Sequence, residues 1–171
     1  MTLQTSLSRR IAPALVVAAF TCSVPAVAEQ HAVPFKATVR TQERMYPDRA
    51  VCPSYPFLFG TTTGTGKASH LGAVSLVASD CFTPGENTFS FSNGKLTLTA
   101  ANGDELNAIY NGELHPLVNT PPYTLYTISG NLTFTGGTGR FVGASGSGYL
   151  SGTENIKTGQ GQFEVTATLA Y

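Results

Sequence analysis

Four side chains in this sequence belong to types that take part in proton transfer: His70, Asp104, Tyr110 and Arg140. A cyclase or isomerase could confine a reactive chain in a productive shape while one such acid or base assists. That chemistry requires a charged or hydroxyl group pointing into an apolar cavity, where its pKa would be shifted. These four residues are therefore our candidates for catalytic groups.

Aromatic side chains could line a binding cavity. If alternate residues of each strand point inward, Tyr110, Tyr126, Phe134 and Phe163 are candidates for contact with an apolar ligand. Packing in the protein core is the competing explanation for each of them. The sequence alone leaves both explanations open.

The sequence contains parts of common cofactor-binding and catalytic motifs, but its residues do not match the spacing that these motifs require. Gly60–Ser69 lacks the first glycine of a phosphate-binding loop, since Thr61 stands there, and Ala68 replaces the hydroxyl that would hold magnesium. Around Ser145 the nucleophile-elbow motif fails because Ser147 stands in place of its last glycine. The three histidines have no partners at zinc-ligand spacing. We expect no cofactor and no metal site.

The N-terminal segment reads as a secretory signal peptide. Arg9 and Arg10 precede the apolar run Ile11–Phe20, and Ala26-Val27-Ala28 forms a cleavage site, which predicts a signal peptide over 1–28 and a single domain over 29–171. The apolar run is too short for a transmembrane helix, which needs about 20 residues. After cleavage eight Lys and Arg face ten Asp and Glu, so the net charge is −2. This lack of basic surplus argues against a nucleic-acid partner.

Two cysteines, Cys52 and Cys81, remain after cleavage. In the oxidising compartments that export implies, an isolated pair is most simply a disulfide. Closing a loop of this length would stabilise the fold by about 3–4 kcal/mol. We expect a secreted or periplasmic protein with one disulfide bond.

The exported part has the composition of strands and turns, rich in Thr, Ser, Val, Phe, Tyr and Gly. Asn-Gly pairs at 93–94, 102–103 and 111–112 match type I′ turns, so we expect a meander of short strands there. The segments 41–53 and 113–122 are expected to be irregular because of their prolines. Regularly spaced strands favour an all-β fold, a single antiparallel barrel of about eight to ten strands. Further strands are expected from alternating residues over 33–39, 57–63, 71–77, 126–134, 146–152 and 163–171.

The passage 126–152, YTISGNLTFTGGTGRFVGASGSGYLSG, resembles the barrels of the allene oxide cyclase and dirigent-protein superfamily. Those proteins carry a strand that ends in a glycine-rich turn, then a Phe, then a stretch of small residues. Here Gly136, Gly137, Gly139 and Phe141 fit this pattern. The passage GTGKASHLG is also similar to uncharacterised secreted bacterial members. The resemblance implies an eight-stranded antiparallel barrel. It implies no activity, because Val142 and Ser145 stand where dirigent proteins have arginines and the cyclase's buried glutamate has no counterpart that we can place.

Four functions remain open from the sequence. The first is an exported barrel that binds a small apolar molecule, since eight strands can just enclose one ligand. The second is a cyclase or isomerase that acts in the barrel lumen. The third is an outer-membrane barrel, although strands of seven residues would fall short of the roughly 9–11 that span a bilayer. The fourth is a structural module of the cell surface. The oligomeric state has no signature in the sequence.

Overall fold

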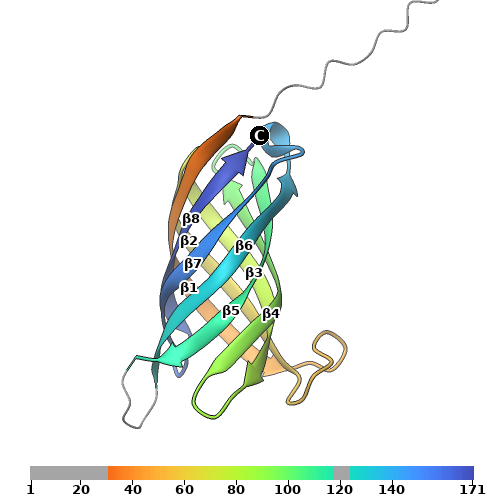
Figure 1. Cartoon of the computed structure of the whole chain (residues 1–171), viewed down its shortest axis with the longest axis vertical. Coiled ribbons are helices and arrows are strands. Elements are labelled where there is room, and N and C mark those ends of the chain that lie inside the picture. The colour runs from red at the N-terminus through yellow and green to blue at the C-terminus, as the bar shows by residue number, and fades with distance from the viewer. Residues whose placement is uncertain (1–30, 118–123) are drawn as a thin grey trace, which may run out of the picture.

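The computed structural model describes residues 31–117 and 124–171, which form one closed barrel of eight antiparallel strands in sequential order (Figure 1). The predicted all-β, eight-stranded antiparallel fold is therefore confirmed. The sheet closes through the pairing of the first and last strands, which leaves no open sheet edge. The strands are β1 (Ala32–Pro47), β2 (Leu58–Ala68), β3 (Gly72–Pro84), β4 (Phe89–Ala100), β5 (Glu105–Pro116), β6 (Leu125–Gly137), β7 (Ser145–Asn155) and β8 (Gln160–Ala170).

We name the two ends of the barrel by what lies there. The terminal end holds the start of β1 and the end of β8, and the disulfide end holds the protruding β1–β2 loop (Figure 1). The expected disulfide is present between Cys52 of this loop and Cys81 of β3, with an S–S distance of 2.03 Å. Cys52 is buried, so the bridge fixes the loop against the barrel wall.

Only one of the three Asn-Gly pairs lies in a turn between strands, and it is not the predicted type I′ turn, because Asn102 does not have a positive φ. Asn102-Gly103 lies in the β4–β5 turn, and Gly103 has a φ of 87°. Asn93 has a φ of 56° and forms a bulge inside β4, whereas Asn111-Gly112 lies in the middle of β5. The predicted seven-residue strands are therefore wrong, because β4 and β5 each have 12 residues. Both segments predicted to be irregular, 41–53 and 113–122, are strand in part, since β1 continues to Pro47 and β5 continues to Pro116.

Two facing glycines explain why the Asn-Gly pair of β5 does not turn. Gly112 and Gly130 pair across β5 and β6, and the ring of Phe91 packs over both. A Cβ atom at Gly112 would lie 2.2 Å from the carbonyl oxygen of Ser129 and 2.5 Å from Cζ of Phe91. Glycine at this position thus lets neighbouring strands curve tightly beneath an aromatic side chain.

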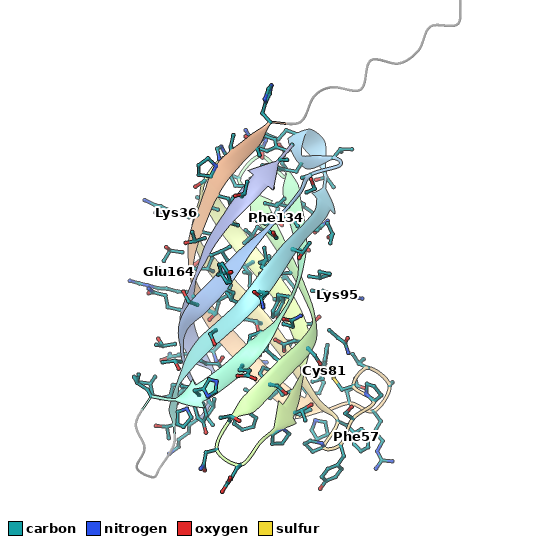
Figure 2. The ribbon with its side chains drawn as sticks, viewed as in Figure 1. Lys36, Phe57, Cys81, Lys95, Phe134 and Glu164 are labelled. Atoms are coloured by element: carbon teal, nitrogen blue, oxygen red, sulfur yellow. A yellow bond between two sulfur atoms is a disulfide. The ribbon has the colours of Figure 1, made fainter. Side chains whose placement is uncertain are left out.

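Inward and outward residues alternate along every strand. Figure 2 shows Lys36, Lys95 and Glu164 pointing away from the barrel, whereas Phe134 lies inside it. The outward positions of the long strands are largely Thr, Ser, Lys and Gln. Of the large apolar side chains on strands, only a few are exposed, among them Val77, Ile109 and Tyr149.

The half of the barrel near the terminal end is filled by an apolar core. Phe35 and Phe134 pack edge to face with their ring centres 5.0 Å apart. Phe141 has no exposed surface and lies in a short 3₁₀ helix (Gly139–Phe141) that follows the glycine-rich turn. Phe141 thus anchors the glycine-rich turn in the apolar core. Its ring contacts that of Tyr171, which belongs to the last residue of the chain.

Within residues 31–117 and 124–171 there is no helix long and apolar enough to cross a membrane. The predicted signal peptide, residues 1–28, lies outside the described residues, as do Pro121 and Pro122 of the predicted irregular segment.

Candidate functional site

Three carboxyl side chains lie inside the half of the barrel near the disulfide end. Glu43, Asp80 and Glu154 are only 7%, 5% and 6% exposed. They come from β1, β3 and β7, and each occupies an inward position of its strand. Burial of three acids is unusual, because ionised carboxyl groups lose the hydration that water gives them.

Two glycines allow these acids to meet. Glu43, Asp80 and Glu154 stand on alternate strands, and Gly60 of β2 and Gly161 of β8 face inward between them. A Cβ atom at Gly60 would lie 2.6 Å from both Asp80 Oδ1 and Glu43 Oε1. A Cβ atom at Gly161 would contact Cγ of Glu154 at 3.4 Å. The absence of side chains on the intervening strands therefore brings the three carboxyl groups together.

Hydroxyl groups support the acids from two sides. The Tyr110 hydroxyl donates a hydrogen bond to Asp80 Oδ2 at 2.9 Å, and the Thr62 hydroxyl donates to Glu43 Oε1 at 3.3 Å. Glu43 and Glu154 are hydrogen-bonded to each other, which requires a proton between the two carboxyl groups. We refer to Glu43, Asp80, Tyr110, Glu154 and Thr62 together as the lumenal acid cluster.

Burial makes the carboxyl groups of this cluster weak acids. It raises the pKa of Glu43 from 4.5 to about 9, and the hydrogen bond and negative charge of Glu154 add to the effect. Burial also raises the pKa of Asp80 well above its ordinary value, with the charge of Glu43 contributing. The pKa of Glu154 is raised by burial too, although the hydrogen bond from Glu43 lowers it in part. The glutamate pair therefore keeps a proton at neutral pH.

No positive charge balances these acids. The two ion pairs among the described residues, His115–Glu113 and Arg140–Asp104, lie elsewhere. Lys, Arg and His are all absent from the described residues that line the space around the cluster. Two buried oxygens, Asp80 Oδ1 and Glu154 Oε1, have no hydrogen-bond partner within the described part of the chain.

A cavity of about 50 Å³ lies against the cluster. Its apolar lining includes Phe82, Phe91, Leu114 and Phe163. The carboxyl groups of Asp80 and Glu154, which carry the two unpartnered oxygens, border it as well. A volume of this size holds roughly three or four water-sized groups. The site therefore offers hydrogen-bonding carboxyl oxygens to a very small occupant surrounded by aromatic and aliphatic side chains.

The outer wall has larger hollows. A hollow of about 590 Å³ is bordered by Asp80 and Tyr110, together with outward residues such as Ser79 and Asn131. Another of about 890 Å³ extends over β1 to β4 and is lined by residues such as Thr38, Ser75 and Thr99. It contains no buried ionisable group. Among residues 31–117 and 124–171 no set of three or more His, Cys, Asp or Glu residues is suited to hold a metal ion. Among the described residues, the lumenal cavity is thus the hollow to which all three buried acids contribute.

Two of the predicted site residues lie at this site. Tyr110 belongs to the acid cluster, and Phe163 lines the cavity. Phe134 lies in the apolar half of the barrel, and Tyr126 is buried against Phe89, with ring centres 5.7 Å apart.

The remaining predicted residues lie at the terminal end, away from the lumen. His70 is exposed and hydrogen-bonds the carbonyl oxygen of Pro34 at 3.0 Å. Asp104 and Arg140 form a surface ion pair, with Arg140 Nε 3.4 Å from Asp104 Oδ2. Of the four proposed catalytic residues, only Tyr110 is brought to the cavity.

Glu43, Asp80 and Glu154 were not predicted from the sequence as site residues. The signal that identifies them is an acid in the inward phase of an alternating strand, as in Val74, Leu76, Ala78 and Asp80. Such an acid is recognisable only when the strand is extended far enough to include it. The predicted strands 71–77 and 146–152 ended just before Asp80 and Glu154.

Comparisons of this chain with protein-family models, curated proteins and solved structures found no match. The functional inference therefore depends on the geometry of the lumen.

Proposed function

We propose that this protein is a small-molecule-binding barrel whose ligand enters the lumen with a polar head against the acid cluster. The observation that carries this proposal is the pair of unpartnered oxygens, Asp80 Oδ1 and Glu154 Oε1, at the border of a cavity. An unsatisfied buried polar group costs about 1–3 kcal/mol. An occupant that hydrogen-bonds both oxygens would recover that free energy.

The size and lining of the cavity define the rest of the ligand. Phe82, Phe91 and Phe163 favour an apolar body over a wholly polar one. The volume of about 50 Å³ favours a molecule of only a few heavy atoms. This narrows the small apolar molecule expected from the sequence to an apolar group that carries one hydrogen-bonding head.

A variant whose cavity is filled by a larger side chain tests this proposal. Ala78 is 5% exposed and lines the cavity, so Ala78→Leu should occupy the space that the ligand needs. The matched control is Ala73→Leu, which alters an exposed position of the same strand. Screening of small amines, alcohols and acids by ligand-observed NMR should detect binding to the wild type and the control but not to Ala78→Leu. Equal binding to all three proteins would refute the lumen as the site.

Acid–base catalysis is a second candidate function, and one observation favours it. Glu43 and Glu154 share a proton in an apolar lumen, which places a general acid beside a general base. An isomerase that moves protons would exchange C–H hydrogens of its substrate with solvent. Incubation of bound ligands in D₂O should then show deuterium incorporation, and Glu154→Gln should slow it by about 10²–10⁴-fold. Ligand binding without deuterium incorporation would contradict catalysis and support binding as the function.

We also propose that the protein is exported and that it belongs to the allene oxide cyclase and dirigent-like barrels. The signal-like segment 1–28 and the buried Cys52–Cys81 disulfide support export, because disulfides persist in oxidising compartments. The eight-stranded barrel and the glycine-rich turn before Phe141 support the family. Cell fractionation with N-terminal sequencing tests export, which predicts a protein that begins at Glu29.

The polar outer wall favours a barrel surrounded by water over an outer-membrane barrel. A lipid-facing barrel needs an apolar outer band about 25 Å tall. Here the outward residues of β2, for example, are Thr61, Thr63, Thr65 and Lys67. The argument from short strands no longer applies, since the strands have 11 to 16 residues. The fractionation above distinguishes the two locations.

A further inference from the structure

We propose that the head group accepted by the lumenal acid cluster is a primary ammonium group and that it binds in exchange for a proton. This inference rests on the proposed binding function and specifies the chemical class of the ligand. It is carried by the arrangement of unpartnered acceptors, uncompensated acids and aromatic rings around one cavity.

Once the carboxyl groups are ionised, their unpartnered oxygens require a hydrogen-bond donor. Asp80 Oδ1 and Glu154 Oε1 border the cavity from β3 and β7, and neither has a partner among the described residues. A primary ammonium group carries three N–H donors and no acceptor, so it can satisfy both oxygens at once. A hydroxyl group has one donor and leaves one of the two oxygens unpaired.

The charge of the cluster selects a cation. Three acids meet in the lumen, and every residue that lines it is neutral or acidic. An anionic head would add repulsion to the burial of its own charge. A cation would instead stabilise the ionised form of the carboxyl groups. The rings of Phe82, Phe91 and Phe163 add the aromatic faces toward which ammonium groups are attracted.

The size of the cavity and its ligand set limit which cations can bind. A space of about 50 Å³ accepts an ammonium group with a chain of roughly one to three carbons. Amines with longer chains exceed it. For metal ions, the described residues provide no suitable set of three or more ligands.

Proton release on binding follows from the protonation of the buried carboxyl groups. The groups that face the cavity are Glu43 from β1, Asp80 from β3, Tyr110 from β5 and Glu154 from β7, and the other four strands contribute only residues that do not ionise. Burial holds protons on the carboxyl groups. When R–NH₃⁺ enters, one carboxyl O–H bond breaks, the electron pair stays on the oxygen, and the proton passes to water. The product is an ammonium–carboxylate pair.

Because binding releases a proton, the affinity for an alkylamine should increase as the pH rises. Release of one proton predicts that the association constant for an alkylamine rises about tenfold per pH unit below the pKa of the group that loses the proton. Alkylamines stay cationic over this range, so the dependence reports the protein. A neutral alcohol of the same length should show no such dependence.

The experiment is isothermal titration of the protein with methylamine, ethylamine and propylamine at pH 6, 7 and 8, in buffers of different ionisation enthalpy. Methanol, ethanol and propanol are the matched neutral probes. We expect saturable amine binding, release of about one proton per amine, and an affinity gain of about tenfold per pH unit. Glu154→Gln and Asp80→Asn should each weaken amine binding at least about tenfold, because one charged acceptor is lost.

The matched control is Glu164→Gln, which changes an outward glutamate of β8 (Figure 2) and should leave binding unchanged. Because the pH series uses the wild type, the test holds even if a variant fails to fold. Alcohols that bind as tightly as amines without proton release would overturn the ammonium inference and keep the binding function. Tighter binding of Ca²⁺ or Na⁺ than of amines would also overturn it. If no probe binds, both proposals fail.

Discussion

The two halves of the barrel are made by the same eight strands but are filled in opposite ways. Near the terminal end, Phe35, Phe134 and Phe141 pack into an apolar core without charged groups. Near the disulfide end, the inward positions hold three acids, a tyrosine and a cavity. The inward phase of β1 illustrates the change, since it runs from Phe35 through Val39 to Glu43 along a single strand.

This contrast separates stability from function within one fold. An apolar core lowers the free energy of the folded state, whereas buried acids without counter-charges raise it. A sequence selected for stability alone would continue the apolar phase to the end of each strand. The presence of Glu43, Asp80 and Glu154 is therefore the reason that we place the proposed function in the half near the disulfide end. The predictions below test this division.

The largest expected effect is a loss of stability as pH rises. The pKa of Glu43 is about 9 in the folded protein and 4.5 as the ordinary value, so the folded state binds a proton that the unfolded state releases between these values. Stability is therefore greatest below about pH 4.5 and falls until the pH passes about 9, by a contribution on the order of 5 kcal/mol. Urea unfolding at pH 5 to 9 measures it.

The control for this experiment is the double variant Glu43→Gln with Glu154→Gln. Amide groups keep the shape of the pair and remove its titration, so the variant should lose most of the pH dependence. It should also exceed the wild type in stability at pH 8. A wild type whose stability is flat or rises over this pH range would show that the lumenal acids are not held protonated by the fold.

A deletion in each half should have unequal effects on stability. Phe134→Ala removes a ring from the filled half and should lower the free energy of unfolding by about 3–5 kcal/mol. Phe163→Ala enlarges a cavity that already exists, so we expect a smaller loss. Denaturant unfolding of both variants, at a pH where the acids are protonated, gives the comparison. Equal losses would mean that the half near the disulfide end is packed as tightly as the other.

Removal of the disulfide should lower the free energy of unfolding by less than the loss of the Phe134 ring does. Its effect should be confined to the disulfide end of the barrel. The bridge joins residues 29 positions apart, which corresponds to about 3–4 kcal/mol of stabilisation. We expect Cys52→Ala with Cys81→Ala to lower stability by that amount. Amide hydrogen exchange should accelerate most in the β1–β2 loop and in β3 near residue 81. Uniform acceleration around the barrel would contradict a local role for the bridge.

Most of the fold could be predicted from the sequence because it depends on local patterns. Alternation marked the strands, and a chain made of strands at regular spacing has to close or pair its edges. The errors came from local signals that tertiary packing overrode. Asn93-Gly94 has the residues of a turn but forms a bulge, and Gly112 lies in a continuous strand because the ring of Phe91 needs the space.

The site was much harder to predict because it depends on contacts distant in sequence. Glu43 and Glu154 are more than a hundred positions apart and meet only because β1, β8 and β7 are neighbours in the closed sheet. The intervening Gly161 carries no chemical signal of its own. Tyr110 was found because a hydroxyl group in an alternating strand is visible locally. Asp104 and Arg140 can be recognised in the sequence in the same way, but they lie beyond the ends of the strands and away from the lumen.

The smallest expected effect concerns the charges at the terminal end. Asp104 and Arg140 form an ion pair whose side chains are 20% and 48% exposed, so water and salt screen their attraction. Asp104→Asn should therefore cost no more than about 1 kcal/mol, and a double-mutant cycle with Arg140→Gln should give a coupling within about 0.2–1 kcal/mol. Unlike the pH effect of the lumenal acids, this coupling should disappear in high salt, because burial rather than attraction between surface charges governs the lumen. A coupling that persists in salt would place a second buried electrostatic site at the terminal end and would end the division between the two halves.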